Sequence, residues 1–331
     1  MEIKINELQK VKTMQINLFK GNRLYSFNKG VDVIIVCQLS DVNFENDFAI
    51  DSKSFDLIKK FSNPDLELIG NELIVKEGKK KFKTKTFKAD LPEFNTSNLT
   101  EFSVNYESLK IARKFTSNKD IRPVLTAINL KENGNIYATD SFVLYRNSIT
   151  DYSNDDNIKS INIPNTFVDI LEKPTDDNIN IKFNNSCVMA KFDNLIYIGR
   201  LIMGDFPKLS RSLRNSGGNS VKYDLTELKS NIEFANNVGT SKENNGNIIC
   251  RLKNNQIRCY GASEYENEID NISYDEDFDL SIVIDKIVLL LSVIKNTNNI
   301  ELKFGGSFTP IICENDNQTI VITPIRQTYS D

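Results

Sequence analysis

The sequence predicts an α+β protein built from three similar domains, each with two helices packed on antiparallel sheets. Three observations lead to this class. A segment that runs from a helix into strands occurs three times, and so does a segment that runs from a strand through a helix into further strands. Apolar and polar residues alternate between the helices, which is typical of half-buried antiparallel strands. The length of 331 residues fits two or three domains of about 100–200 residues each.

The first kind of segment opens each domain with a polar, cap-like start and a leucine on a predicted helix. Its three copies are INELQK (5–10), NYESLKIARKF (105–115) and DLTELKSNIEF (224–234). The shared leucines are Leu8, Leu109 and Leu228. Strand-like sequence follows each copy, so we expect a helix and then strands in the first half of every domain. The first of these helices is expected to be short, because the sequence is compressed between Lys10 and Lys29.

The second kind of segment passes from a short strand into a helix with an apolar face. Its three copies are FAIDSKSFDLIKK (48–60), INIPNTFVDILEK (161–173) and LSIVIDKIVLLLSVIK (280–295). Each is followed by alternating strand sequence with a polar turn. We therefore predict domains at 1–97, 98–214 and 215–331, the second boundary falling in the Gly- and Ser-containing segment 214–220.

Charge is divided unevenly among the three domains, with net values of +2, +1 and −7. Charged residues also alternate along two predicted strands, so that each set lies on one face. The two sets are Lys79, Lys81, Lys83 and Lys85, and Glu264, Glu266, Glu268 and Asp270. Such charges keep solvated edge strands from aggregating. Alternatively, the two sets form a dimer interface between the first domain of one copy and the third of another, where cross-strand ion pairs of about 0.2–1 kcal/mol each set partner and register.

Several classes of chemistry are disfavoured by what the sequence lacks. Histidine is absent, which removes the commonest general base and zinc ligand, and no G-x-x-x-x-G-K-[ST] or G-x-G-x-x-G phosphate loop occurs. The five cysteines stand singly and are expected to be buried thiols. The N-terminal residues show no signal-peptide pattern, and no apolar run is long enough to span a membrane. We predict no catalytic residues, no metal site and no cofactor, and a cytoplasmic protein without a membrane partner.

Four stretches resemble the bacterial DNA polymerase III beta subunit, the beta sliding clamp. The stretch IRPVLTAINLKENGNIYATDSFVLY (121–145) resembles the family's R-P-x-L, strand and A-T-D-[GS]-H-R-L pattern. RLIMGDFPKLSR (200–211) is similar to R-L-I-x-G-x-F-P-x-Y, with Leu209 where an aromatic residue is usual. DLPEF (90–94) resembles the first-domain echo of the F-P element, and VITPIRQ (321–327) resembles the terminal V-M-P-M-R.

The resemblance implies three clamp-type domains per chain, helices inside and sheets outside, with two chains assembling head to tail into a ring around duplex DNA. It implies a DNA sliding clamp, a processivity factor that is not an enzyme. The implied partners are double-stranded DNA without sequence preference, a replicative DNA polymerase, a clamp loader and a second copy in a homodimer. A head-to-tail interface that closes in this way gives a cyclic assembly.

Basic residues on ring-lining helices would contact phosphates, which position a protein on DNA without reading its sequence. The predicted helix 105–118 carries a basic face beside an apolar stripe. An ordinary solvated face is the alternative interpretation. The candidate DNA-lining residues are Lys10, Lys12, Lys59, Lys60, Lys110, Arg113, Lys114, Lys119, Lys229 and Lys295.

The resemblance also implies an apolar cleft for partner peptides between the second and third domains, although its apolar members suit a plain core equally well. The corresponding residues here are Leu125, Thr139, Ser141, Phe142, Val143, Leu144, Pro207, Arg211, Ser212, Pro310, Val321, Thr323, Pro324, Ile325 and Arg326. Phe142 and Val143 stand where the family has His and Arg, and Thr323 and Ile325 replace two methionines, which are adaptable side chains. We expect a narrower or different set of partners.

Two other functions stay open at the level of sequence. One is an enzyme that uses carboxylates and a divalent metal, since Asp and Glu together number 45. The other is a clamp-fold interaction protein that no longer encircles DNA.

Overall fold

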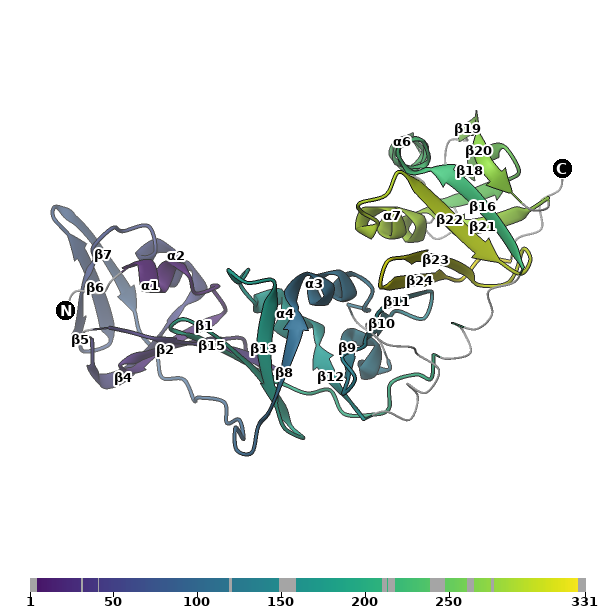
Figure 1. Ribbon diagram of the computed structural model, residues 1–331. Helices are drawn as coiled ribbons and strands as arrows, with labels where there is room; N and C mark the ends of the chain where they lie inside the picture. Colours follow the sequence, from purple (N-terminus) through teal and green to yellow (C-terminus); the bar gives the residue numbers. More distant parts are fainter. Residues whose placement is uncertain are drawn as a thin grey trace. The chain divides into compact units, whose positions relative to one another are not determined.

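The computed structural model describes residues 5–30, 32–40, 42–118, 121–148, 159–209, 213, 218–238, 248–260, 265–274 and 277–326. The chain divides into two compact units. The first unit is Met1–Lys110 with Ile163–Ile202, and the second unit is Ile111–Asn162 with Met203–Asp331. Each unit contains strands from two successive repeats of the sequence (Figure 1).

The first unit holds an eight-stranded antiparallel sheet in the order β4-β1-β2-β3-β15-β14-β13-β8 and a three-stranded sheet β5-β6-β7. Helices α1 and α2 lie side by side on one side of its strands (Figure 1), and Gln9 of α1 donates to the backbone carbonyl of Lys59 at 3.3 Å. The elements are α1 (Ile5–Gln9), β1 (Ile16–Gly21), β2 (Arg23–Phe27), β3 (Val33–Gln38), β4 (Phe44–Asp51), α2 (Ser52–Ile58), β5 (Asp65–Ile69), β6 (Glu72–Glu77), β7 (Lys80–Lys85), β8 (Thr100–Asn105), α3 (Tyr106–Lys114, continuing into the second unit), α4 (Asn165–Ile170), β13 (Asn178–Phe183), β14 (Cys187–Phe192) and β15 (Leu195–Arg200).

The second unit holds a nine-stranded sheet in the order β12-β9-β10-β11-β24-β23-β22-β16-β20 and a four-stranded sheet β19-β18-β17-β21. Helices α6 and α7 pack against each other. The elements are η1 (Pro123–Thr126), β9 (Ala127–Lys131), β10 (Ile136–Thr139), β11 (Val143–Asn147), β12 (Ser160–Pro164), β16 (Asn219–Asp224), α6 (Leu225–Val238), β17 (Ile249–Lys253), β18 (Gln256–Tyr260), β19 (Tyr265–Glu268), β20 (Asn271–Tyr274), β21 (Asp279–Val283), α7 (Ile284–Val293), β22 (Asn299–Phe304), β23 (Ile311–Asn315) and β24 (Gln318–Ile322).

The order of elements repeats three times along the described chain. A helix followed by three strands occurs as α1-β1-β2-β3, α3-β9-β10-β11 and α6-β17-β18-β19, and a strand, a helix and three strands occur as β4-α2-β5-β6-β7, β12-α4-β13-β14-β15 and β21-α7-β22-β23-β24. The predicted α+β class with a three-fold repeat of two helices on antiparallel sheets is therefore confirmed. The helix α1 has five residues, as the compressed sequence predicted.

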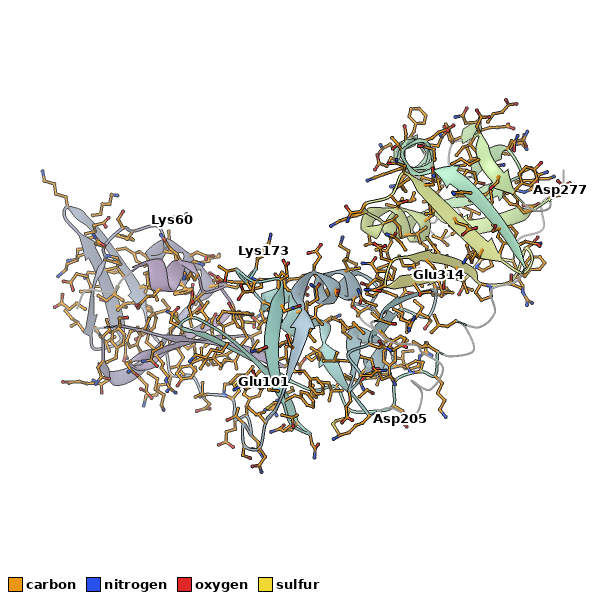
Figure 2. The ribbon with its side chains drawn as sticks, in the orientation of Figure 1. Lys60, Glu101, Lys173, Asp205, Asp277 and Glu314 are labelled. Carbon is orange, nitrogen blue, oxygen red and sulfur yellow. The ribbon has the colours of Figure 1, made fainter. Side chains whose placement is uncertain are left out.

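Helices and strands occupy different sides of the first unit. Figure 2 places Lys60, the second residue after α2, on the helical side and Glu101, on β8, on the side of the strands. Asp51 begins α2 as its N-cap, and its side chain accepts a hydrogen bond from the Ser54 amide at 2.8 Å, which satisfies a free donor of the first turn. The buried Phe55 and Ile58 face the strands, so the helix is held by its apolar side.

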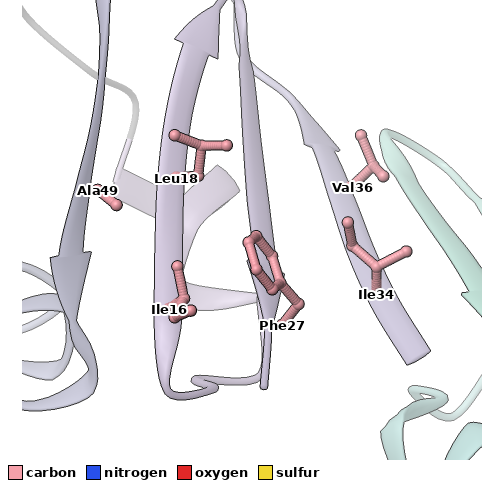
Figure 3. Packing of buried hydrophobic residues seen from close by; sticks show 6 residues of the cluster. All are labelled: Ile16, Leu18, Phe27, Ile34, Val36 and Ala49. Carbon is pink, nitrogen blue, oxygen red and sulfur yellow. The ribbon is translucent and has the colours of Figure 1, made fainter. Parts of the chain in front are cut away.

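The sheet of the first unit has an apolar cluster made by its strands β1–β4. Its members are Ile16, Leu18, Phe27, Ile34, Val36 and Ala49, all buried (Figure 3). Ile196 and Ile198 of β15 pack against the same cluster. On β15, Gly199 allows α4 to approach closely, because a Cβ at this position would lie 2.9 Å from Cδ2 of Phe167. This tight fit holds α4 against a strand of its own repeat, and the pairing of β15 with β3 joins the two repeats within one sheet.

Candidate partner-docking surface and helix-borne cations

The strands β11 and β24 join the second and third repeats into one sheet. They pair antiparallel, with Leu144 directly opposite Val321. Both side chains belong to a buried cluster that continues across the sheet. The other members are Tyr137, Ile312 and Leu213, with Phe206 and Leu209 packed against them. We call this set, with Leu144 and Val321, the junction cluster.

A tight turn between β10 and β11 forms the rim of the junction cluster. The carboxylate oxygen Oδ1 of Asp140 accepts hydrogen bonds from the backbone amides of Phe142 and Val143, each at 2.9 Å. The hydroxyl of Thr139 donates to the carbonyl of Val143 at 2.6 Å. Ser141 adopts φ of 83°, a left-handed conformation that costs energy for a residue with a Cβ. Asp140 therefore holds the shape of the turn, which is the role that short Asp side chains commonly have.

The second carboxylate oxygen of Asp140 forms an ion pair with Lys286 of α7 at 2.5 Å. Both side chains are less than a quarter exposed, so the charges are partly shielded from solvent. The Lys286 ammonium also lies 5.8 Å from the ring centroid of Phe142, within the range of a cation–π contact. Phe142 itself is 61% exposed. The turn thus links the second repeat to the third and presents an aromatic ring to solvent.

The predicted cleft residues fall into three groups by exposure. Leu125, Thr139, Val143, Leu144, Val321 and Pro324 are buried; Pro207, Pro310 and Ile325 are half-buried; and Ser141, Phe142, Thr323 and Arg326 are exposed. Arg211 and Ser212 lie outside the described residues. The backbone amide of Thr323 donates to the carbonyl of Phe142 at 2.8 Å, so the two stretches that depart from the family pattern meet here. The structure brings these stretches together, while Leu125 lies in the core.

Sequence reasoning passed over several residues of this surface. Tyr137 and Ile312 lie two positions from Thr139 and Pro310, so the period of two along a strand was a signal that could have identified them. Phe206 lies next to Pro207 in segment 200–211, which resembles the family pattern. Lys286 had no such signal, because its contact with Asp140 joins residues 146 positions apart.

The candidate cations of the first unit lie at the ends of α1 and α2. Lys10 pairs with Asp193 at 3.3 Å, and Lys12 donates to the carbonyl of Asp169 at 3.0 Å. Lys59 donates to the carbonyl of Val11 at 3.1 Å and lies 3.7 Å from Asp56. Lys60 is exposed on the helical side (Figure 2). The ammonium groups of Lys10, Lys12 and Lys59 therefore have partners within the protein. Among the described residues, no hydrogen bond or ion pair is recorded for the exposed side chain of Lys60.

The candidate cations on and after helix α3 differ in their exposure and in their hydrogen bonds. Lys110 is half-buried and donates to the carbonyls of Val168 and Leu171 at 2.5 and 3.2 Å. Arg113 donates to Thr116 Oγ1 and to Asn118 Oδ1, each at 3.2 Å. Other candidates are exposed: Lys114 on α3, Lys229 on α6 and Lys295 after α7. Lys119 lies outside the described residues.

The two predicted charge ladders lie on edge strands of the two small sheets. Lys81, Lys83 and Lys85 are exposed on β7, and Lys79 is in the turn before it. Glu266 and Glu268 are exposed on β19, and Asp270 is exposed just after it. Glu264 lies outside the described residues. Within one chain, Glu266 pairs with Arg258 at 2.6 Å and Lys83 lies 3.9 Å from Glu72.

The described residues contain no cluster of three or more His, Cys, Asp or Glu side chains that could hold a metal ion. The five cysteines are free and buried. Burial raises the pKa of the thiols of Cys37 and Cys313 to about 12, so they stay protonated at neutral pH and are poor nucleophiles. Among the described helices, none has the length and apolar character to cross a membrane.

Comparison with known proteins identifies the class. A crystal structure of the DNA polymerase III subunit beta from Pseudomonas aeruginosa superposes with a TM-score of 0.79 at 19% identity, covering 99% of this chain and 100% of that one. The DNA polymerase sliding clamp from Bacillus subtilis gives a TM-score of 0.78 at 17% identity, covering 99% of each chain. The chain therefore has the sliding-clamp fold throughout.

Sequence comparison leads to the same family. Residues 108–208 match the central domain of the DNA polymerase III beta subunit. The beta sliding clamp of Staphylococcus aureus (strain N315) is 26% identical over 328 residues, covering 91% of this chain and 83% of its own length. That of Staphylococcus epidermidis is 25% identical over 329 residues, with the same coverage. The predicted resemblance is confirmed: this chain is related to the beta sliding clamps in sequence and shares their fold.

Proposed function

We propose that this chain is a DNA sliding clamp that acts as a processivity factor and catalyses no reaction. The observation that carries the proposal is the three-fold repeat, combined with a clamp fold over nearly the whole chain. A ring around DNA raises the effective concentration of a tethered polymerase at the primer end without changing its chemistry. The proposed domains are 1–97, 98–214 and 215–331, and the proposed assembly is a head-to-tail homodimer in the cytoplasm.

Contacts with duplex DNA are assigned to the helices. Lys60, Lys114, Lys229 and Lys295 are exposed at or after helices in each of the three repeats, and lysine ammonium groups bind phosphates as point charges. Such contacts are independent of base sequence. The net charge of −4 argues against tight static binding, which suits a ring that slides.

Partner peptides are assigned to the junction cluster and its rim. The cluster offers an apolar floor on which half-buried Phe206 and Leu209 pack. The exposed Phe142 precedes β11, and the exposed Arg326 follows β24 by four residues. The Arg326 guanidinium lies 5.8 Å from the ring centroid of Phe308, which is itself exposed. Apolar anchors flanked by an arginine favour a short peptide with large apolar side chains. The proposed partners that contain such a peptide are a replicative polymerase and a clamp loader.

Retention on circular DNA tests the ring. The protein is loaded onto nicked circular DNA with its clamp loader, and half of the sample is linearised before gel filtration in moderate salt. A topological link keeps the protein on the circle and lets it slide off the ends of the linear form. Equal loss from both forms would contradict encirclement.

Peptide binding tests the docking surface. Pro324→Ala combined with Ile325→Ala should abolish binding of a polymerase C-terminal peptide, measured by calorimetry, while the solution mass of the ring is unchanged. Ile272→Ala is a matched control, because Ile272 is exposed on β20, outside the proposed surface. Undiminished affinity in the double variant, or equal loss in the control, would count against the assignment.

A clamp-fold interaction protein that no longer encircles DNA is the alternative, and one observation favours it. Several candidate DNA-lining cations have partners within the protein, among them Lys10, Lys59 and Lys110. The circular-DNA assay separates the two functions, since the alternative predicts no difference between circular and linear DNA. A metal-dependent enzyme is tested by nuclease and phosphatase assays with and without chelator, where any metal-dependent turnover would contradict the clamp proposal.

A further inference from the structure

The small sheet of the third repeat places two cysteines directly opposite each other. Cys250 of β17 pairs with Cys259 of β18 in an unbroken antiparallel register. Their side chains are 0% and 2% exposed, and both thiols are free. Elsewhere in the described sheets, the strand neighbours of the remaining cysteines are Leu24 and Leu195 for Cys37, Arg200 for Cys187, and Ile320 for Cys313.

The backbone brings the two Cα atoms of this pair close together. The amide of Ile284 donates to the carbonyl of Ile248 at 2.9 Å, so Ile248 is a hydrogen-bonded position toward β21, and Cys250, two residues further on, is another. The backbone groups of Cys250 therefore point away from β18, and Cys250 and Cys259 form a non-hydrogen-bonded pair. Cα atoms in such pairs are about 4.5 Å apart, and disulfides span Cα separations of about 4.4–6.8 Å. The backbone is thus already placed for a disulfide.

The side chains of the pair lie on one face of the sheet and interact. A hydrogen bond with Cys259, together with burial, holds the pKa of the Cys250 thiol well above its ordinary value. Tyr265 of β19 lies opposite Cys259 and shares its face, and the Tyr265 hydroxyl donates to Asn231 Oδ1 of α6 at 2.8 Å. The pair therefore faces α6, and half-buried Tyr265 is the residue beside it at the edge of the sheet.

We propose that Cys250 and Cys259 form a redox modification site, at which hydrogen peroxide joins β17 and β18 through a disulfide. Peroxide gains access when β19, an edge strand of four residues, separates from β18, because short segments at an edge open locally at a small cost. Cys259 is uncovered first, since it lies next to β19, whereas Cys250 lies between β18 and β21. The inference goes beyond the proposed clamp function and needs only the small sheet of the third repeat.

The reaction consumes one peroxide for two thiols. The Cys259 thiolate attacks one peroxide oxygen, the O–O bond breaks, and a sulfenic acid and a hydroxide form. The Cys250 sulfur then attacks the sulfenic sulfur, so that an S–S bond forms and the S–O bond breaks with loss of a second hydroxide. The two thiol protons convert the two hydroxides to water. The two sulfur atoms together lose two electrons, and the peroxide gains them.

The geometry of the pair also indicates that the modification is reversible. The Cα separation of a non-hydrogen-bonded pair lies at the short end of the range for disulfides, and disulfides away from the usual geometry are more easily reduced. The bond should therefore form with peroxide and be removed by a dithiol. While it is present, it holds the hairpin of β17 and β18, with which β19 pairs, in one register.

Peptide mapping of the oxidised full-length chain tests the pair. Native protein is treated with a small excess of hydrogen peroxide near neutral pH, the remaining thiols are blocked with N-ethylmaleimide in denaturant, and trypsin is added without a reductant. Trypsin cleaves after Arg251, Lys253 and Arg258, so the two cysteines stay joined only by a disulfide. We expect this linkage to dominate, the intact mass to fall by two hydrogen atoms, and dithiothreitol to reverse both changes. Equal amounts of other linkages, or a linkage that forms only after unfolding, would overturn the proposal.

Single variants test the order of the two steps and the route of access. In Cys250→Ala the sulfenic acid at Cys259 has no second thiol and should be trapped by dimedone, whereas Cys259→Ala should give at least about fivefold less label at Cys250. Tyr265→Ala should speed disulfide formation by about threefold or more, because it uncovers Cys259. Equal labelling of the two single variants, or an unchanged rate in Tyr265→Ala, would contradict entry at the β19 edge.

A lone buried cysteine provides the matched control. Cys313→Ala should form the disulfide at the rate of the wild type, because the strand neighbour of Cys313 is Ile320. Loss of the linkage in this variant would contradict the assignment to Cys250 and Cys259. Urea unfolding shows whether each variant is folded, and the peptide map of the wild type decides the proposal even where a variant fails to fold.

Discussion

The sheet junction β11·β24 and the edge strands β7 and β19 occupy equivalent places in the repeat, yet their side chains differ in kind. At the junction, Tyr145 and the opposing Ile320 are 0% and 1% exposed. At the edges, Lys81 and Glu266 are exposed, although the equivalent residues of the junction, Thr319 and Arg146, are buried. A junction within one chain never has to exist open in water, so both of its faces are buried. An edge that meets its partner only on assembly is exposed beforehand, and charges keep it soluble.

The largest expected effect on stability comes from removing a buried side chain at the internal junction β11·β24. Tyr145→Ala removes a buried ring that stacks on Phe115 at 5.1 Å between centroids, and should lower the free energy of unfolding by about 3–5 kcal/mol. Urea unfolding monitored by circular dichroism measures it. Lys83→Ala on β7 is the control and should change stability by no more than about 0.5 kcal/mol. Similar losses of unfolding free energy in the two variants would contradict the proposed difference between the internal junction and the edge strand.

The turn before β11 is the next way to weaken the internal junction. Asp140→Ala removes the acceptor of two backbone amides and the partner of Lys286, and should cost about 2 kcal/mol. Asp140→Asn keeps an oxygen for the amides and loses the charge, so it should cost less. Equal losses in a chemical denaturation series would show that the ion pair with Lys286 carries the whole effect.

Salt should affect the two regions differently. Raising the salt concentration from about 0.1 to 1 M shortens the screening length from about 10 to 3 Å and should weaken the dimer by roughly tenfold. The midpoint of urea unfolding should change less, because the internal junctions bury mostly apolar side chains. Sedimentation at both salt concentrations measures the first quantity. A dimer that is insensitive to salt would contradict a charged closing contact.

The smallest effect concerns Cys37, which lies opposite Leu195 in the internal junction β3·β15. Burial raises the pKa of its thiol to about 12, so the thiol is protonated at pH 8 and reacts only when the junction opens. Labelling by a disulfide reagent at pH 8 should be slow in the native protein and complete in denaturant. Rapid labelling of Cys37 in the native state, identified by mass spectrometry, would show that this junction opens readily.

The repeating elements were predictable because they depend on short-range patterns. The segment 48–60 was predicted to pass from strand to helix, and the structure has β4 ending at Asp51 and α2 at Ser52–Ile58. The alternating lysines were predicted to lie on one strand, and Lys81, Lys83 and Lys85 are exposed on one face of β7, with Lys79 in the turn before it. A period of two or 3.6 is visible within ten residues, since it follows from backbone geometry alone.

Local sequence patterns could not predict which strands pair across repeats. β3 and β15 are more than 150 residues apart in the chain, and an apolar strand such as Val33–Gln38 would pair equally well with many others. The ion pair between Asp140 and Lys286 and the donation from Lys110 to the carbonyls of Val168 and Leu171 are likewise contacts between distant segments. Their residues look like ordinary solvated charges in the sequence.

The sequence by itself determined the α+β class, the three-fold repeat, the charge ladders and the resemblance to the beta sliding clamps, because each depends on residue type and spacing. The tertiary structure alone decided that successive repeats share one sheet, that Asp140 shapes a turn and anchors Lys286, and that β7 and β19 are left as open edges. The reason is physical: hydrogen-bond register and side-chain burial arise only when segments far apart in the chain meet.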